Sequence, residues 1–203
     1  MSNGAVNESR RRFLVGSTSL VGAVGAVGAA VPFVGSWNPS ARALAAGAPV
    51  TIDISRLEEG ALLGPLPAWR GQPIFVLRRG SETLENLASN TAHLADPDSK
   101  NSDQQPAYAQ NEYRSIKPDI SVLVGLCTHL GCSPQVSAAA GPQEYDPNWT
   151  NDYYCPCHGS MFDLAGRVYR GVPAPDNLVV PPHFYETDDV IVIGLDGPAG
   201  ENT

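Results

Sequence analysis

Two short segments hold all four cysteines and two of the four histidines of this 203-residue chain. The first segment, CTHLGC, begins at Cys127 and places His129 two positions after that cysteine. The second, CPCHGS, begins at Cys155 and places His158 three positions after it. Thiolate and imidazole groups bind transition metals, so this clustering indicates a metal site, a local disulfide or both.

The order of ligand types within each segment distinguishes between metals. Structural zinc sites pair like with like, with two cysteines on one arm and two histidines on the other. Here each arm offers a cysteine followed by a histidine. A [2Fe-2S] cluster in which one iron takes two thiolates and the other takes two imidazoles fits these mixed arms. The spacing therefore favours such a cluster, with zinc as the alternative.

The two segments closely resemble the cluster-binding boxes of the Rieske iron-sulfur proteins, and we call them box 1 (residues 127–132) and box 2 (residues 155–160). The resemblance implies that Cys127 and Cys155 bind the buried iron of one [2Fe-2S] cluster. It implies equally that His129 and His158 bind the outer iron. Their outer ring nitrogens would then meet a quinol at an exposed tip, His158 first and His129 second.

The resemblance also implies a disulfide between Cys132 and Cys157 that ties the two boxes together. The simpler Rieske ferredoxins and oxygenase domains lack this second cysteine pair. Its presence favours the quinol-oxidising branch of the family.

Three neighbours of the boxes have expected supporting roles. Ser160 matches the serine with which the family donates a hydrogen bond to a cluster sulfur. Leu130 resembles the apolar shield beside the cluster, although an ordinary packing leucine is the alternative. Phe162 stands where many members have a tyrosine that donates to a cysteine sulfur. Loss of that donor predicts a lower midpoint potential, because hydrogen bonds to the sulfurs stabilise the added electron.

The segments that must position the boxes are short and rich in β-branched residues. Strands are predicted at 49–55, 73–80, 121–126, 178–186 and 190–194, with a hairpin turning at 164–166 after box 2. Ser81 is expected to cap a helix over 81–89, and residues 90–118 read as a polar insertion that is either packed or mobile. The fold class is an all-β Rieske-type domain of antiparallel sheets with a small cluster-binding subdomain, preceded by one transmembrane helix.

The N-terminal part predicts membrane export. Phe13 to Val34 is an apolar stretch of 22 residues, long enough at about 1.5 Å per residue to cross a hydrocarbon core of about 30 Å. The preceding SRRRFLV resembles a twin-arginine signal, which exports folded proteins and so suits a protein that takes up its cofactor first. A cleaved signal peptide is the alternative, because ARA (41–43) and ALA (43–45) are acceptable cleavage sites.

With the span retained as an anchor, the arginines stay in the cytoplasm and the rest of the chain lies outside. The predicted organisation is a cytoplasmic N-terminus at 1–12, an anchor at 13–34, a flexible hinge at 35–49 and a Rieske domain at 50–203, with its cluster-binding subdomain at about 122–177.

The overall charge narrows the range of partners. The formal charge of −8, from 13 basic and 21 acidic residues, argues against a nucleic-acid partner, which requires clustered basic residues. The arginine motif, the span, the alanine-rich hinge and the loop GVPAP after box 2 together resemble the Rieske subunit of a bacterial cytochrome bc complex.

That resemblance implies an oxidoreductase subunit, not catalytic alone, that passes electrons from membrane quinol to a membrane-bound c-type cytochrome. It implies a cytochrome b subunit as partner, a dimeric multi-subunit complex, and a single-pass protein of the bacterial inner membrane with its head in the periplasm. The alternatives are the small Rieske subunit of a periplasmic molybdenum oxidase, such as arsenite oxidase, and a purely structural metal domain.

Overall fold

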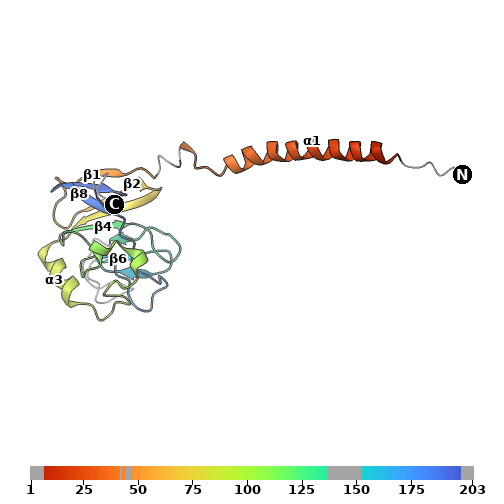
Figure 1. The fold of residues 1–203 in the computed structure, drawn as a ribbon. Coiled ribbons are helices and arrows are strands. Elements are labelled where there is room, and N and C mark those ends of the chain that lie inside the picture. The colour runs from red at the N-terminus through yellow and green to blue at the C-terminus, as the bar shows by residue number, and fades with distance from the viewer. Residues whose placement is uncertain (1–6, 42, 44–46, 137–151, 198–203) are drawn as a thin grey trace. The chain divides into compact units, whose positions relative to one another are not determined.

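The computed structural model describes residues 7–41, 43, 47–136 and 152–197 (Figure 1). The chain divides into two compact units, Met1–Ala45 and Ala46–Thr203. The second unit, which we call the head, carries both boxes. The predicted cleavage sites, residues 41–45, lie largely outside the described residues.

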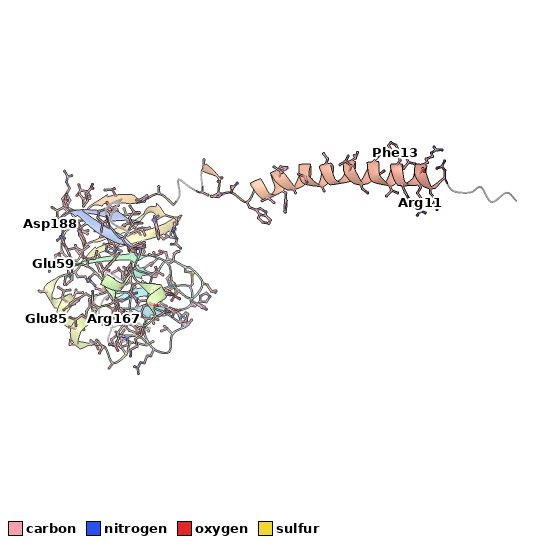
Figure 2. All side chains as sticks on the ribbon, in the orientation of Figure 1. Arg11, Phe13, Glu59, Glu85, Arg167 and Asp188 are labelled. Carbon is pink, nitrogen blue, oxygen red and sulfur yellow. A yellow bond between two sulfur atoms is a disulfide. The ribbon has the colours of Figure 1, made fainter. Side chains whose placement is uncertain are left out.

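The first unit is built on the helix α1 (Glu8–Gly35). The side chain of Asn7 caps it by accepting a hydrogen bond from the backbone N–H of Arg10 at 3.1 Å. The helix extends beyond the predicted apolar span at both ends, so the arginine motif, marked by Arg11 in Figure 2, lies in its first turns. Its length and mean hydropathy of 1.8 qualify it to cross a membrane, the only such helix among the described residues.

The described residues of the head form three antiparallel sheets of three strands each, which confirms the predicted all-β class. The first sheet has the order β1 (Val50–Asp53), β9 (Val190–Ile193), β8 (His183–Thr187); the second is β2 (Leu62–Trp69), β3 (Gln72–Arg78), β4 (Ile120–Val124); the third is β5 (Gln135–Val136), β6 (Tyr153–Cys155), β7 (Ser160–Phe162).

The second sheet, which we call the middle sheet, is covered on both faces. Alternate side chains of a strand point to opposite faces, so each face of this sheet packs in a different core. In β3, Ile74 and Val76 belong to a core shared with β1 and β9. Phe75 and Leu77 belong to a second core, which also contains residues of β6, β7 and both boxes. Figure 1 shows β4 with β1 and β8 on one side and β6 on the other. The boxes are thus supported on a sheet in which strand β4 and the centre of β3 are buried.

The helix α3 (Ser81–Ser89) has the predicted bounds, but the predicted cap is wrong. Gly80 occupies the N-cap position with an extended backbone, and its carbonyl accepts the first helical hydrogen bond from the N–H of Leu84 at 3.0 Å. Ser81 is therefore the first residue of the helix, and its side chain does not cap it.

The polar insertion at residues 90–118 is packed against the head. It forms two short 3₁₀ helices, η1 (Ser102–Gln104) and η2 (Ala107–Ala109). Leu94 is fully buried and forms a β-bridge with Tyr169, and Arg114 is also fully buried. The packed version of the two predicted alternatives is the one observed.

His183 lies at the start of β8 and is 1% exposed. Its Nδ1 lies 2.8 Å from the carbonyl oxygen of Pro181, while Nε2 has no hydrogen-bond partner among the described residues. Burial lowers the pKa of His183 below its usual value of about 6.5, because the charged ring loses its hydration. Folding therefore favours the neutral form of this histidine.

A pH-dependent loss of stability is expected from His183. Below about pH 6.5 the unfolded chain takes up a proton that the folded head resists, so stability falls as pH falls, by at most about 1.4 kcal/mol per pH unit. The His183→Asn variant keeps a donor for Pro181 and does not titrate. Thermal unfolding of both proteins between pH 7.5 and 5 checks this, and an equal loss of Tm in both would contradict it.

Candidate metal centre

Box 1 begins directly after the middle sheet. The chain leaves β4 at Val124 and passes tightly over the ring of Phe75, where a Cβ on Gly125 would lie 2.6 Å from a ring carbon. The N–H of Gly125 donates to the carbonyl of Pro73 at 2.8 Å, so this exit is fixed by the neighbouring strand. Cys127 thereby starts its box within the second core, at 3% exposure.

The two boxes fold as the same tight turn. In box 1 the N–H of Gly131 donates to the carbonyl of Cys127 at 2.9 Å, and in box 2 the N–H of Gly159 donates to that of Cys155 at 2.9 Å. Both glycines have a positive φ, 80° and 76°, which other residues rarely adopt. Each turn therefore presents a cysteine at its start and a histidine within it, as the sequence predicted.

The two thiols lie in the second core and contact each other. Cys127 and Cys155 are free cysteines at 3% and 1% exposure. Burial is the largest cause that raises the pKa of the Cys155 thiol, and a hydrogen bond with Cys127 adds to it. Two buried thiolates require a nearby cation to be stable, and a metal ion supplies that charge.

The two imidazoles also come together. The ring centroids of His129 and His158 lie 4.7 Å apart and their planes meet at 84°. Nδ1 of His129 is buried and has no hydrogen-bond partner among the described residues. A buried acceptor without a donor is costly, and a metal ion satisfies it. Two thiols and two imidazoles from adjoining turns fit the ligand set of a Rieske cluster, one pair for each iron.

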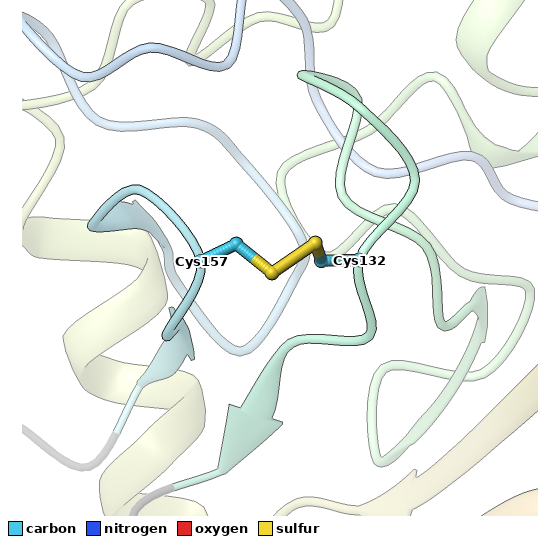
Figure 3. The surroundings of a disulfide bond; sticks show 2 residues. All are labelled: Cys132 and Cys157. Atoms are coloured by element: carbon cyan, nitrogen blue, oxygen red, sulfur yellow. A yellow bond between two sulfur atoms is a disulfide. The ribbon is translucent and has the colours of Figure 1, made fainter.

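A disulfide joins the two boxes. Cys132 and Cys157, 25 residues apart in the chain, are bonded in the structure, as the resemblance implied (Figure 3). The sulfurs of Cys132, Cys155 and Cys157 lie within 4.8 Å of one another, which by distance alone resembles a second metal-binding set. The sulfurs of Cys132 and Cys157 are bonded to each other, so neither is a thiolate, which is the form of cysteine that binds metals. We therefore assign this set to the disulfide and retain Cys127 in the ligand set.

The loop that contains GVPAP is attached to both boxes. Thr128 Oγ1 donates to the carbonyl of Asp176 at 2.6 Å, and the N–H of Ala174 donates to Ser160 Oγ at 3.0 Å. Ser160 is fully buried and, as acceptor in that bond, keeps its own hydroxyl proton for a further partner. Its donation to a cluster sulfur stays a prediction. The sequence reasoning missed Thr128, whose position inside box 1 was the available signal.

The other two predicted neighbours of the cluster, Leu130 and Phe162, differ in their exposure to solvent. Leu130 is 72% exposed, so it is not an ordinary core leucine, and its shielding role stays a prediction. Phe162 is fully buried in the core that contains both free cysteines. The other two histidines lie elsewhere, with the ring of His93 4.3 Å from that of Tyr169 and His183 bonded to Pro181.

Comparisons with known proteins agree with this geometry. Residues 100–182 match the family model described as the Rieske [2Fe-2S] domain, and residues 1–40 match that described as the ubiquitinol-cytochrome c reductase Fe-S subunit TAT signal. The fold and the site thus define a Rieske-type [2Fe-2S] protein, and the cofactor prediction is confirmed.

Full-length relatives identify the family within this class. The chain is 56% identical over 196 residues to the ubiquinol-cytochrome c reductase iron-sulfur subunit of Allochromatium vinosum, covering 97% of this chain and 93% of the relative. It is 40% identical over 187 residues to the subunit of the same name in Rhodospirillum rubrum, covering 92% of each. The chain belongs to the family of ubiquinol-cytochrome c reductase iron-sulfur subunits.

Proposed function

We propose that this chain is the electron-transfer subunit that carries electrons from membrane quinol to a membrane-bound c-type cytochrome in a cytochrome bc complex. The observation that carries the proposal is that two buried thiols contact each other, and two imidazoles contact each other, on two matching turns joined by a disulfide. The reported relatives are subunits of ubiquinol-cytochrome c reductase, so the molybdenum-oxidase alternative is not favoured.

In the proposed site, Cys127 and Cys155 hold the buried iron, while His129 and His158 hold the outer one. The bound cluster supplies a one-electron acceptor with a potential of about −150 to +300 mV, because neutral imidazoles leave it less negative than thiolates would. His158 is exposed. The ring nitrogen of His158 that does not bind iron would accept the hydrogen bond of the quinol hydroxyl and take its proton, while the electron would pass to the cluster. His129 provides the second imidazole.

The chain completes this reaction only with partners. We place residues 1–12 in the cytoplasm, 13–34 across the inner membrane as a single anchor and 35–49 as a flexible hinge, with the head (residues 50–203) in the periplasm. The apolar helix α1 and the match to the export-signal family support the anchor. The disulfide supports the oxidising periplasm. The proposed partners are a cytochrome b subunit, which completes the quinol site, and a membrane-anchored c-type cytochrome, within a dimeric complex.

Washed membranes that contain the natural protein test the function. Added quinol should reduce the c-type haem, and His158→Gln membranes should lose that reduction while retaining b- and c-type haem. A quinol-independent reduction of the c-type haem, or reduction by arsenite alone, would contradict the proposal.

Phe162→Tyr is expected to raise the midpoint potential. The ring of Phe162 lies in the core with both proposed cysteine ligands, and a hydroxyl there offers a cysteine sulfur the donor that phenylalanine lacks. One hydrogen bond of about 0.5 to 1.5 kcal/mol corresponds to about 20 to 65 mV for a one-electron couple. Protein-film voltammetry checks this against Phe184→Tyr, which adds the same hydroxyl in β8. A midpoint that falls or stays unchanged in Phe162→Tyr contradicts the expectation.

A further inference from the structure

Three arginines are buried in the head, which is unusual because a buried charge loses its hydration. Arg79, Arg114 and Arg167 are 2%, 0% and 1% exposed. They come from the position directly after β3, from the insertion at residues 90–118 and from the segment that follows β7. We call these three side chains the arginine group.

Two members of the arginine group, Arg79 and Arg114, reach the turn that follows box 2, although the shorter hydrogen bonds of Arg79, at 2.8 Å, go to the carbonyl of Tyr113 and the hydroxyl of Ser115. Nη1 of Arg114 donates to the carbonyls of Ala165 at 3.1 Å and Gly166 at 3.3 Å. Nη1 of Arg79 reaches the carbonyl of Leu164 at 3.5 Å. Two guanidinium groups from distant parts of the chain therefore end on three successive carbonyls of one turn.

This turn lies in the same core as the proposed ligands. Leu164 packs in the core that contains both Cys127 and Cys155, and so does Phe162 at the end of β7. The carbonyl that Arg79 reaches therefore belongs to a residue of the core that contains both proposed cysteine ligands. Charges interact more strongly through a protein interior than through water, and salt screens buried charges little.

The buried carboxylates only partly balance the arginine group. Arg167 Nε donates to Asp163 Oδ2 at 2.6 Å, and Asp152 accepts from the hydroxyl of Tyr169. Among the buried residues of the described part, three guanidinium groups therefore stand against two carboxylates, Asp152 and Asp163. Burial lowers the pKa of Arg79 and of Arg114 to about 10, so both stay charged at neutral pH.

We propose that the arginine group acts as a fixed positive field that raises the midpoint potential of the cluster, and that one role of the insertion at residues 90–118 is to supply Arg114 to it. Reduction adds one negative charge at the metal centre, and nearby cations stabilise that charge. The inference rests on the proposed ligand set, since it requires the cluster at the two boxes.

Two substitutions of opposite charge test the proposal in the full-length, cluster-containing protein. Arg114→Gln removes a cation and should lower the midpoint. Asp163→Asn removes an anion, while its remaining side-chain oxygen can still accept from the N–H groups of Ala165 and Arg167, and should raise the midpoint. Loosening of the turn would move both midpoints in the same direction, so opposite signs identify a charge effect. If one variant fails to fold, the other supports the proposal when its midpoint shifts in the predicted direction and the shift persists at high ionic strength; a shift in the opposite direction, or none, overturns it.

The matched control is Arg170→Gln. Arg170 is exposed and donates through Nε to the carbonyl of Leu94 at 2.7 Å, so the variant loses an arginine whose charge is exposed to water. Its midpoint should shift less than that of Arg114→Gln. Raising the ionic strength should remove the Arg170→Gln shift and leave the Arg114→Gln shift.

Voltammetry together with the electron paramagnetic resonance (EPR) spectrum separates the outcomes. Opposite shifts with an unchanged spectrum support the proposal. If the variants retain the EPR spectrum of a cluster with mixed thiolate and imidazole ligands, midpoint shifts of the same sign, or no shifts, overturn the proposal about the arginine group. The proposed function is then left intact. A wild-type protein without that spectrum overturns both.

Discussion

The Cys127→Ser and Cys155→Ser variants are expected to contain no [2Fe-2S] cluster. Both thiols are buried in one core and in contact, so under the proposed assignment the loss of either leaves the buried iron without half of its protein ligands. His158→Gln should lose the cluster as well. Iron and acid-labile sulfide per protein, measured after purification, should fall from two of each to near zero, consistent with one [2Fe-2S] centre.

The matched controls are cysteine and histidine positions outside the proposed set. The Cys132→Ser/Cys157→Ser double variant and His93→Gln should both retain iron and sulfide when freshly purified. The close approach of the sulfurs of Cys132, Cys155 and Cys157 offers the opposing assignment. Loss of iron from the double variant at once, with full iron in Cys127→Ser, would contradict the ligand set proposed here.

The same double variant is expected to be much less stable than the wild type. The disulfide closes a loop of 25 residues, and its loss should cost about 3.5 kcal/mol through the entropy of the unfolded chain. The two boxes would then be held together through the metal centre and the loop bonded to Thr128 and Ser160. Cluster loss on mild heating should therefore be faster than in the wild type.

Denaturant unfolding in detergent measures this difference. A thiol reductant is the internal control, because it should destabilise the wild type and leave the double variant unchanged. Equal stability of the two proteins under oxidising conditions, or an effect of the reductant on both, would contradict a stabilising role for the disulfide.

The strands most visible in the sequence are those with uninterrupted β-branched residues. The predictions at 73–80 and 121–126 correspond to β3 and β4, which are buried on both faces and so read as continuous apolar runs. The strand β2 was missed because it contains Gly64, Pro65 and Pro67, which indicate a loop. Its pairing with β3 has register shifts on both sides of Leu66, so it is an irregular edge strand that tolerates these residues.

A metal centre could be predicted from the sequence because its proposed ligands are local pairs. Cys127 with His129 and Cys155 with His158 each lie within one turn, so their spacing carries the information. The arginine group has no such signature. Its members are 35 and 53 positions apart along the chain, and only the packing of the insertion against the turn after β7 brings them together.

An EPR spectrum of the dithionite-reduced wild-type protein, recorded with its metal and sulfide content, tests the central assignment most directly. Mixed thiolate and imidazole ligation predicts two irons and two sulfides per chain and a lower average g value than that of an all-cysteine ferredoxin. Zinc in place of iron, an absence of inorganic sulfide, or the spectrum of an all-thiolate cluster would contradict it.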